Sequence, residues 1–337
     1  MMYYKNKMQK LRKVAITIGE PGGIGPEVAV RTAADRQLRR LCVPVLIGDA
    51  APVQKALDML SLPLKLRAVS GPSEEKQSAG YIDLIPMGAI GRKFKKGAPT
   101  TEGGAACYEY IKKGVQLALS GEVSAVCTAP ISKEALKMAG VPYPGHTEML
   151  ADITGAKKFA MMLIGGPLRV VLVTTHAAIK DVPGLINRKA VFEKILLAQK
   201  AAKMLAIGRG KARIAVCGLN PHAGEAGLFG EEEIRHIAPA VRQAKEKGVN
   251  AIGPAVPDAI FRKAYMGEVD IIVAMYHDQG LIPLKMIAFD TGVNVTVGLP
   301  IIRTSPDHGT AYDIAWKGLA NPASMIEAVK TALSLKI

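Results

Sequence analysis

The sequence contains few cysteines and few aromatic residues, and both shortages exclude whole classes of protein. Four of the 337 residues are cysteines, widely spaced and without a CxxC pair: Cys42, Cys107, Cys127 and Cys217. This pattern fits neither a disulfide framework nor a cysteine-ligated zinc site, and it is typical of a protein in a reducing cytoplasm. Aromatic residues make up 5% of the chain. That fraction is too small for the stacking surfaces on which single-stranded nucleic acids bind.

Long apolar runs and the two commonest nucleotide-binding motifs are also missing. No run approaches the length that spans a bilayer, and the basic start of the chain, MMYYKNKMQKLRK, lacks the apolar stretch of a secretory signal. We therefore expect a soluble, cytoplasmic protein with no membrane partner. Neither GxGxxG nor GxxxxGKS/T occurs, which argues against a Rossmann fingerprint and against a P-loop. The glycine-rich stretch GEPGGIGPE at 19–27 is weak evidence of ligand binding, because a plain strand-to-helix turn has a similar composition.

Acidic residues are in short supply, with 29 Asp and Glu against 44 Lys and Arg and a formal net charge of +15. Such an excess admits nucleic acid, anionic lipid or a small anion as a partner. The basic residues are spread over amphipathic helices such as 188–203 rather than gathered in one stripe, so we expect no nucleic acid partner. Most of this charge is interpreted as solvated surface, and a small phosphorylated substrate is the favoured anion.

The apolar content, 49% of 337 residues, is sufficient for two modest α/β domains or one large one. Short apolar runs alternate with helical patterns, which predicts a mainly parallel sheet covered by helices on both faces. Strands are predicted at 14–18, 43–47, 82–86 and 125–128, with helices at 101–120, 189–206 and 322–335. The proline-rich stretch 142–148 is a candidate hinge. A hairpin is predicted from 161–164 and 168–173, which flank Gly-Gly-Pro.

Three histidines follow apolar runs that read as buried strands: His176, His222 and His277. Loops at the carboxyl ends of neighbouring parallel strands converge on one crevice, so these imidazoles could hold a divalent metal and leave a fourth position open. Asp278 and Glu225 are candidates to orient the ring N–H groups, although either could be a loop cap. Each histidine taken singly is more often structural than a ligand.

Such a site would serve a metal-activated hydrolase or a dehydrogenase, and the residue types alone do not decide between these two reactions. Lys285, Asn294 and Arg303 suit a phosphate or carboxylate, with a surface lysine, a turn asparagine and an ion-paired arginine as the alternative interpretation. His236 is interpreted as a surface residue of a helix. The acidic triplet 231–233 is interpreted as helix capping and surface charge.

Seven motifs occur together in order: GEPGGIGPE, TAPISKEAL, GHTEML, VTTH, GLNPHAGEAGLFGEEE, AMYHDQGLIPLK and GVNVTVGLPIIRTSPDHGTAYDIA. In these motifs the chain resembles the 4-hydroxythreonine-4-phosphate dehydrogenase family of pyridoxal phosphate biosynthesis, over nearly its full length from about Val14. The resemblance implies an α/β fold of the isocitrate and isopropylmalate dehydrogenase type, with two α/β/α domains and an active-site cleft between them. We assign 1–140 plus 295–337 to the first domain and 141–294 to the second. A homodimer is also implied.

The resemblance implies NAD and one divalent metal (Zn, Mg or Co) as cofactors. The metal ligands it implies are His176, His222 and His277, one of them from the partner subunit of a shared active site. The substrate contacts it implies are His146, Thr147, Lys285, Asn294 and Arg303. The implied reaction oxidises 4-phosphohydroxy-L-threonine to 2-amino-3-oxo-4-phosphooxybutanoate, which loses carbon dioxide to give 3-amino-2-oxopropyl phosphate. No residue is assigned as the catalytic base or to the NAD contacts.

Three positions depart from the expected family motifs: Ser132, Ala259 and Trp316. They leave the metal ligands unaffected but bear on the substrate. A sister group of the same fold oxidises 4-phospho-D-threonate or 4-phospho-D-erythronate, and it is the main alternative. From other classes, a metallohydrolase would use Glu225 or Asp278 as general base. A non-catalytic phosphate-binding protein ranks last.

Overall fold

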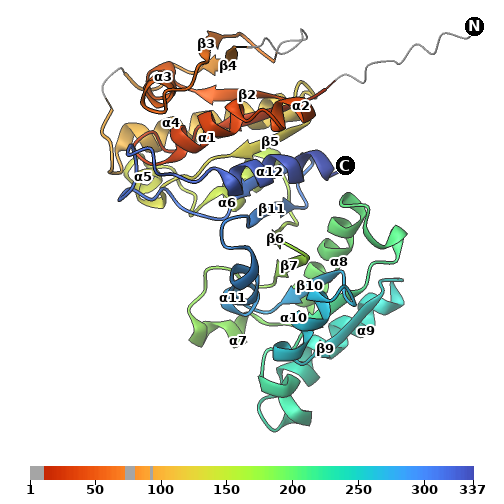
Figure 1. Cartoon of the computed structure of the whole chain (residues 1–337). Coiled ribbons are helices and arrows are strands. Elements are labelled where there is room, and N and C mark those ends of the chain that lie inside the picture. Colours follow the sequence, from red (N-terminus) through yellow and green to blue (C-terminus); the bar gives the residue numbers. More distant parts are fainter. Residues whose placement is uncertain (1–10, 73–79, 92–93) are drawn as a thin grey trace, which may run out of the picture.

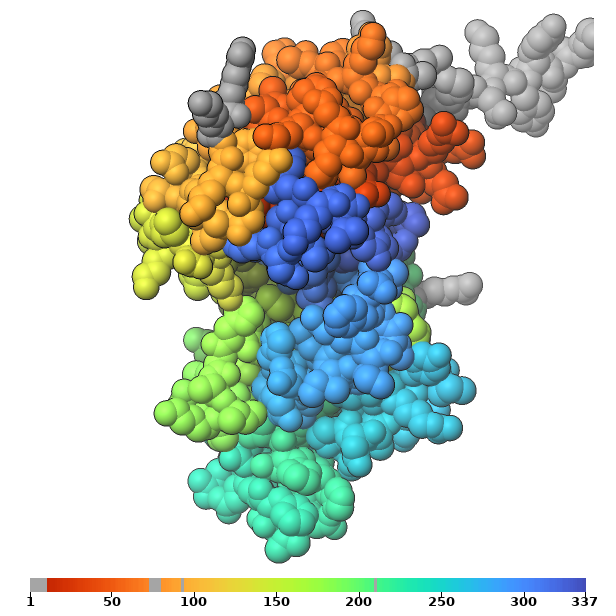
Figure 2. All heavy atoms as spheres, turned by 60° about the vertical axis from the view of Figure 1, so that its left-hand side comes forward, coloured from red at the N-terminus to blue at the C-terminus, as the bar shows by residue number. Residues whose placement is uncertain are grey.

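The computed structural model describes residues 11–72, 80–91 and 94–337. In this part of the chain, twelve strands form one mixed sheet in the order β3-β4-β2-β1-β5-β12-β11-β6-β7-β10-β8-β9. Figure 1 shows the chain as an upper half built on β1–β5 and a lower half built on β7–β10, with β11 and β6 where the halves meet. In the space-filling view the dark blue end of the chain lies against the orange upper half (Figure 2).

The strands of the upper half are parallel to one another, and all except the edge strand β3 are buried at their centre. Every residue of β2 and β5 is buried, which is the pattern of strands covered on both faces. The predicted strands at 43–47, 82–86 and 125–128 are confirmed. The five strands are β1 (Arg12–Thr17), β2 (Cys42–Gly48), β3 (Lys65–Ala68), β4 (Tyr81–Pro86) and β5 (Ala125–Thr128).

The upper half carries most of the helices near the N-terminus and the last helix of the chain. They are α1 (Gly25–Ala34), α2 (Leu38–Leu41), α3 (Ala50–Met59), α4 (Thr101–Leu119), α5 (Lys133–Met138), α6 (His146–Thr154) and α12 (Ala323–Ser334). The predicted helix at 101–120 is confirmed as α4, which begins after Thr100, whose hydroxyl accepts from the amide of Gly103. The predicted start of α12 is one residue early: Pro322 is its N-cap, and Asn321 Oδ1 accepts from the amide of Ala323.

The centre of the sheet is antiparallel, which the prediction of a mainly parallel sheet did not include. There β11 (Val293–Val297) runs antiparallel to both β12 (Arg303–Pro306) and β6 (Ala160–Gly165). The predicted hairpin is confirmed, because β6 pairs antiparallel with β7 (Leu168–Leu172). These central strands connect the two halves through continuous hydrogen bonding. The domain boundaries given above stay a prediction.

The lower half repeats the parallel arrangement with β8 (Ile214–Cys217), β9 (Ala251–Ala255) and β10 (Ile271–Ala274). Its helices are α7 (Val182–Leu185), α8 (Arg188–Met204), α9 (Ala238–Glu246), α10 (Pro257–Tyr265) and α11 (His277–Ala288). Short 3₁₀ turns at Ile179–Asp181, Ile207–Gly210 and Pro221–Gly227 and a π-helical turn at Glu233–Ile237 complete it.

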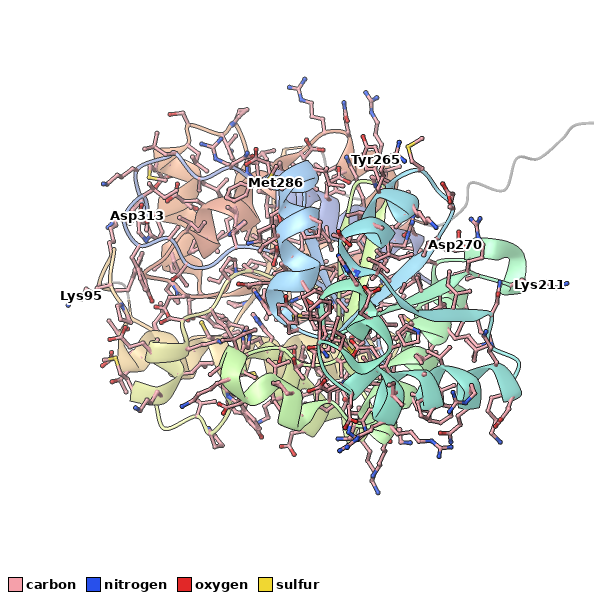
Figure 3. All side chains as sticks on the ribbon, turned by 90° about the horizontal axis from the view of Figure 1, so that it is seen from below. Lys95, Lys211, Tyr265, Asp270, Met286 and Asp313 are labelled. Atoms are coloured by element: carbon pink, nitrogen blue, oxygen red, sulfur yellow. The ribbon has the colours of Figure 1, made fainter. Side chains whose placement is uncertain are left out.

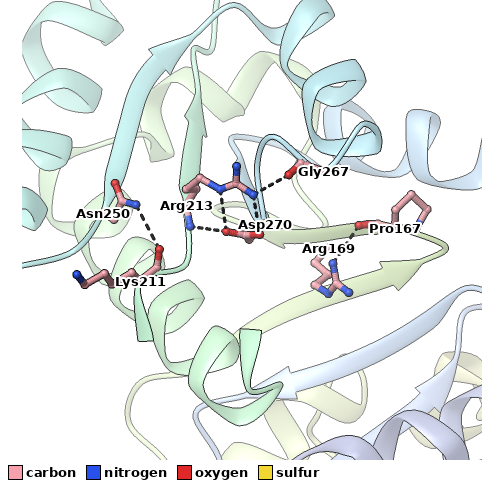
Figure 4. Close-up of polar contacts among 7 residues, drawn as sticks. All are labelled: Pro167, Arg169, Lys211, Arg213, Asn250, Gly267 and Asp270. Carbon is pink, nitrogen blue, oxygen red and sulfur yellow. Dashed lines mark hydrogen bonds and ion pairs between the residues drawn. The ribbon is translucent and has the colours of Figure 1, made fainter. Parts of the chain in front are cut away.

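The amino ends of β8 and β10 are held together on the edge of the sheet opposite the site described below (Figure 4). Asp270 Oδ2 accepts from the backbone amide of Arg213 at 2.7 Å, and its Oδ1 lies 3.2 Å from the Arg213 guanidinium, which also donates to Gly267 O. This leaves the carboxyl ends of the same strands for functional groups. Among the described residues, no helix has both the length and the apolar character needed to cross a membrane.

Candidate metal and phosphate site

A cavity of about 440 Å³ lies where the two halves meet, and most of the predicted site residues line it. The segments that line it are the end of β5, the starts of α5 and α6, β6, the loop after β7, one face of α11, and strands β11 and β12. The predicted residues brought together there are His146, Thr147, His176, His277, Lys285, Asn294 and Arg303. Residues almost 160 positions apart in the chain therefore meet because the antiparallel strands connect the two halves.

Arg303, the first residue of β12, is the buried cation of the cavity. It is 1% exposed, and its guanidinium donates to Thr296 Oγ1 at 3.1 Å and to Thr128 Oγ1 at 2.7 Å. Within the described ranges no carboxylate forms a salt bridge with it, so the predicted alternative of an ordinary ion-paired arginine is wrong. Burial lowers the Arg303 pKa to about 10, and the group stays charged at neutral pH. A buried charge without a counter-ion is unfavourable, and an anionic ligand would remove that cost.

Other polar atoms of the cavity are also buried without a hydrogen-bond partner in the protein: His146 Nε2, Asn294 Oδ1, His308 Nε2 and Arg303 Nε. His146 is the first residue of α6, whose amino end favours negative charge. Burial, and secondarily the charge of Arg303, hold the His146 pKa well below its usual range. The neutral ring would therefore bind a phosphate by donating a hydrogen bond. Unsatisfied buried polar atoms at one end of a cavity indicate a ligand site.

Lys285 adds a second cation to the lining of the cavity. It lies within α11 rather than in a loop, with its Nζ 3.6 Å from Asp307 Oδ2. Burial raises the Asp307 pKa, and the nearby Lys285 opposes that shift. Asn294 lies within β11 rather than in a turn. Both positions face the cavity from regular elements, which makes them more rigid than loop residues.

His176 and His277 lie side by side in the cavity, with ring centroids 5.8 Å apart. His277 is the first residue of α11, and its Nδ1 lies 2.7 Å from Asp278 Oδ1, so its Nε2 is available to a ligand. Burial, then the charges of Lys133 and His277, lower the His176 pKa, which favours the neutral imidazole that binds metals. A carboxylate on the far ring nitrogen is the usual support for a metal-binding histidine. The pair therefore fits a divalent cation.

His222 lies outside this cavity, in a turn between β8 and the π-helical segment. Its side chain is 63% exposed, and its Nδ1 lies 3.0 Å from Glu225 Oε2. No group of three His, Cys, Asp or Glu able to hold a metal occurs among the described residues of one chain. Within one chain the structure brings His176 and His277 together and leaves His222 outside the cavity. The third ligand from a partner subunit stays a prediction.

The turn that carries His222 has an uncommon backbone. Six consecutive residues have positive φ, and four of them are not glycine: His222 at 53°, Ala223 at 55°, Glu225 at 43° and Ala226 at 55°. Left-handed backbone costs about 1–2 kcal/mol for each residue with a Cβ.

The prediction for the acidic triplet is wrong at Glu233, which is 3% exposed and accepts from the amides of Leu219 and Asn220.

Several cavity residues had no role in the sequence analysis, among them Asp307 and His308. They directly follow β12. The sequence signal was available: if the SPDHG stretch is interpreted as the end of a strand, the argument used for the other histidines also identifies these two residues. Burial lowers the His308 pKa. The carboxylates of Glu225 and Asp278 lie within hydrogen-bond distance of the Nδ1 atoms of the histidines that they were predicted to orient.

A family model described as "Pyridoxal phosphate biosynthetic protein PdxA" matches residues 40–332. The chain belongs to the PdxA family. The 4-hydroxythreonine-4-phosphate dehydrogenase of Desulforapulum autotrophicum is 45% identical over 320 residues, 95% of this chain and 94% of that protein. The D-threonate 4-phosphate dehydrogenase of Cupriavidus necator is 43% identical over 328 residues, 96% of each chain. The PdxA relatives of this chain thus divide between two named substrates.

Solved structures agree with the family assignment. The 4-hydroxythreonine-4-phosphate dehydrogenase of Klebsiella pneumoniae superposes with a TM-score of 0.89 at 40% identity, covering 98% of this chain and 100% of that chain. A beta-decarboxylating dehydrogenase from Thermococcus kodakarensis matches with a TM-score of 0.50 at 16% identity, over 95% of this chain and 82% of that one. At that identity the match shows the fold alone. The predicted α/β fold of the isocitrate and isopropylmalate dehydrogenase type is confirmed.

Proposed function

We propose that this PdxA-family chain oxidises 4-phosphohydroxy-L-threonine to 2-amino-3-oxo-4-phosphooxybutanoate with NAD and a divalent metal. The product then loses carbon dioxide and yields 3-amino-2-oxopropyl phosphate, a step of pyridoxal phosphate biosynthesis. The relatives that carry the name of this activity, at 44–46% identity, support the proposal.

The observation that carries the proposal is the buried cation without a counter-ion, Arg303, facing the same cavity as the His176–His277 pair. A phosphate at the Arg303 end would accept from the guanidinium and from the neutral His146 ring. Lys285 and the amino end of α6 would add further positive potential. The substrate carbon skeleton would then extend toward the imidazole pair.

The metal would be held by His176 and His277, with His222 supplied by a second copy of the chain. A divalent ion bound there supplies Lewis-acid stabilisation of negative charge on the substrate hydroxyl oxygen while hydride leaves for NAD. Asp278 holds the His277 ring by its Nδ1, and Thr128 and Thr296 hold the Arg303 guanidinium. These contacts fix the phosphate end and the reacting end relative to each other before substrate binds.

The test is direct. Purified protein given NAD, a divalent metal and 4-phosphohydroxy-L-threonine should produce reduced cofactor, measured by its absorbance. No turnover by folded, metal-loaded protein would contradict the proposal. Release of inorganic phosphate without NAD would instead favour the metallohydrolase alternative.

D-threonate 4-phosphate is the second candidate substrate, because relatives named for that activity reach 43% identity over 96% of this chain. The two substrates share the phosphate and the oxidised hydroxyl, and differ in an amine or a hydroxyl at the second carbon. Comparison of kcat/KM for the two, with 4-phospho-D-erythronate as a third, decides between them. A kcat/KM for D-threonate 4-phosphate above that for the amino acid would reassign the substrate.

We also propose that a second copy of the chain completes the site. An apolar face of α11 is exposed next to the cavity, and its residues are Ile282, Met286, Ile287 and Phe289. Met286, 81% exposed, is labelled in Figure 3 on this helix. Exposed apolar faces of this kind are typical of protein–protein interfaces. A homodimer would bury this face and would bring an outward-pointing His222 within reach of another chain.

A further inference from the structure

The left-handed turn that carries His222 folds around one buried carboxylate. Glu233 Oε1 accepts from the amides of Leu219 and Asn220 at 2.7 and 2.8 Å, and Oε2 accepts from Asn220 Nδ2 at 2.9 Å. No Lys or Arg within the described ranges forms a salt bridge with this carboxylate. The N–H groups that start the turn therefore provide its stabilisation.

The glycines of the turn leave room for this carboxylate. A Cβ at Gly224 would lie 2.7 Å from Glu233 Oε2, and a Cβ at Gly218 would lie 3.0 Å from Glu233 Oε1. A Cβ at Gly230 would meet the Asn220 amide at 2.6 Å. The carboxylate thus occupies the inside of the turn next to Gly218 and Gly224, and a side chain at Gly224 would displace it.

Glu233 itself belongs to a firmly held element. It is the first residue of the π-helical turn Glu233–Ile237, which continues directly into α9. Ile237 and Val241 are buried in the core, where α9 packs against α8. The chain of contacts therefore runs from the core through Glu233 to Leu219 and Asn220, and from there to the turn Pro221–Gly227, which also contacts α10 and β9.

We propose that Glu233 is a positioning residue for the metal site: its buried carboxylate holds the left-handed turn so that His222 is presented outward with Nε2 free. The proposal rests on the proposed function, in which His222 is a metal ligand. Glu225 fixes the ring through Nδ1 at 3.0 Å, and Glu233 fixes the backbone that carries it. With both constraints in place, the His222 side chain and its backbone lose little conformational freedom when a cation binds.

The experiment is a Co²⁺ titration of the metal-free full-length protein, followed by the visible absorption bands of the bound ion. Glu233→Gln should weaken Co²⁺ binding by about 10-fold or more, in the range typical of residues that support a metal ligand. It should lower kcat while the KM for NAD stays as in the parent. Glu231→Gln is the matched control, because Glu231 is an exposed carboxylate two residues away that pairs with Arg235. Its Co²⁺ affinity should equal that of the parent.

A rescue variant separates positioning from general stability. Ala226→Gly removes one Cβ from the left-handed backbone. In the Glu233→Gln background it should recover part of the lost Co²⁺ affinity. If Glu233→Gln does not fold, Asn220→Ala removes one donor to the carboxylate and should weaken Co²⁺ binding by about 10-fold. Parental affinity in folded Asn220→Ala would then overturn the proposal.

His222→Ala distinguishes this proposal from the function on which it rests. If His222→Ala keeps the parental Co²⁺ affinity, His222 is not a ligand and the proposed metal site fails. If His222→Ala loses affinity while folded Glu233→Gln keeps it, the metal site stands and the positioning role of Glu233 is overturned.

Discussion

At the scale of single residues, the site depends on charges and rings whose partners lie both near and far in the sequence. Arg303 is held by hydroxyls from β11 and β5, and His277 by its neighbour Asp278. Burial lowers the pKa of His146 and keeps that ring neutral beside a guanidinium. Burial raises, rather than lowers, the pKa of a buried carboxyl group near the amino end of the chain, Glu20.

Replacement of Arg303 by alanine should raise the KM for the phosphorylated substrate by about 100-fold, because charge-assisted hydrogen bonds to a dianion are lost. Metal content should stay as in the parent, since Arg303 lies at the phosphate end of the cavity. Steady-state kinetics and metal analysis measure both quantities. Arg188→Ala, on the exposed surface of α8, is the control. An unchanged KM would remove Arg303 from substrate binding.

Glu20 should make stability depend on pH. It is 1% exposed, and burial raises its pKa from 4.5 to about 7, although a hydrogen bond from the Gly22 amide opposes the shift. Its contribution to stability is therefore fully present below pH 4.5 and is lost as pH rises through 7. Between pH 5 and pH 8, the free energy of unfolding of Glu20→Gln should change by about 2–3 kcal/mol less than that of the parent.

Urea unfolding at the two pH values measures this difference. Glu109→Gln is the control, because Glu109 is a partly exposed carboxylate on α4. Equal pH sensitivity in the parent and Glu20→Gln would show that Glu20 titrates as it would in solvent.

At the scale of elements, close packing of helices around the cavity depends on small residues. Gly104 of α4 lies against the backbone of α5, and a Cβ there would overlap the carbonyl of Ala135. This contact fixes α5, whose first residue, Lys133, lines the cavity. A glycine in a helix interior is normally unfavourable, so its presence here has a packing reason.

Gly104→Ala should therefore destabilise the protein by about 1–3 kcal/mol, because overpacking outweighs the gain in helix propensity. The midpoint of thermal unfolding should fall. Gly184→Ala is the matched control: Gly184 lies in α7 with no atom within 4 Å of an added Cβ, and the substitution should be neutral or slightly stabilising. A stabilised Gly104→Ala variant would show that α4 and α5 can separate at little cost.

At the scale of the whole molecule, the cavity of a single chain is lined by two of the three proposed metal ligands, His176 and His277, while His222 lies outside it. Met286→Asp should therefore both disrupt the proposed dimer and weaken metal binding, because the exposed apolar face of α11 would carry a charge. Light scattering measures the mass, and a Co²⁺ titration measures the affinity. Leu41→Asp, at an exposed apolar residue of the upper half, should change neither quantity. A monomer with full metal affinity would contradict the shared site.

The sequence by itself determined several of the strands, the limits of α4, α8 and α12 to within two residues, and the identity of seven cavity residues. Hydrophobic periodicity and strand-end polarity are local signals, and they placed β2, β4, β5 and the hairpin β6–β7 correctly. The tertiary structure decided the rest. Antiparallel pairing at the centre of the sheet, the hydroxyl partners of Arg303 in place of a carboxylate among the described residues, and the outward position of His222 all depend on contacts between segments distant in the chain. Glu233 is the clearest case: an acidic triplet has the sequence pattern of a solvated cap, and only packing shows that its last member is buried against the Leu219 and Asn220 amides.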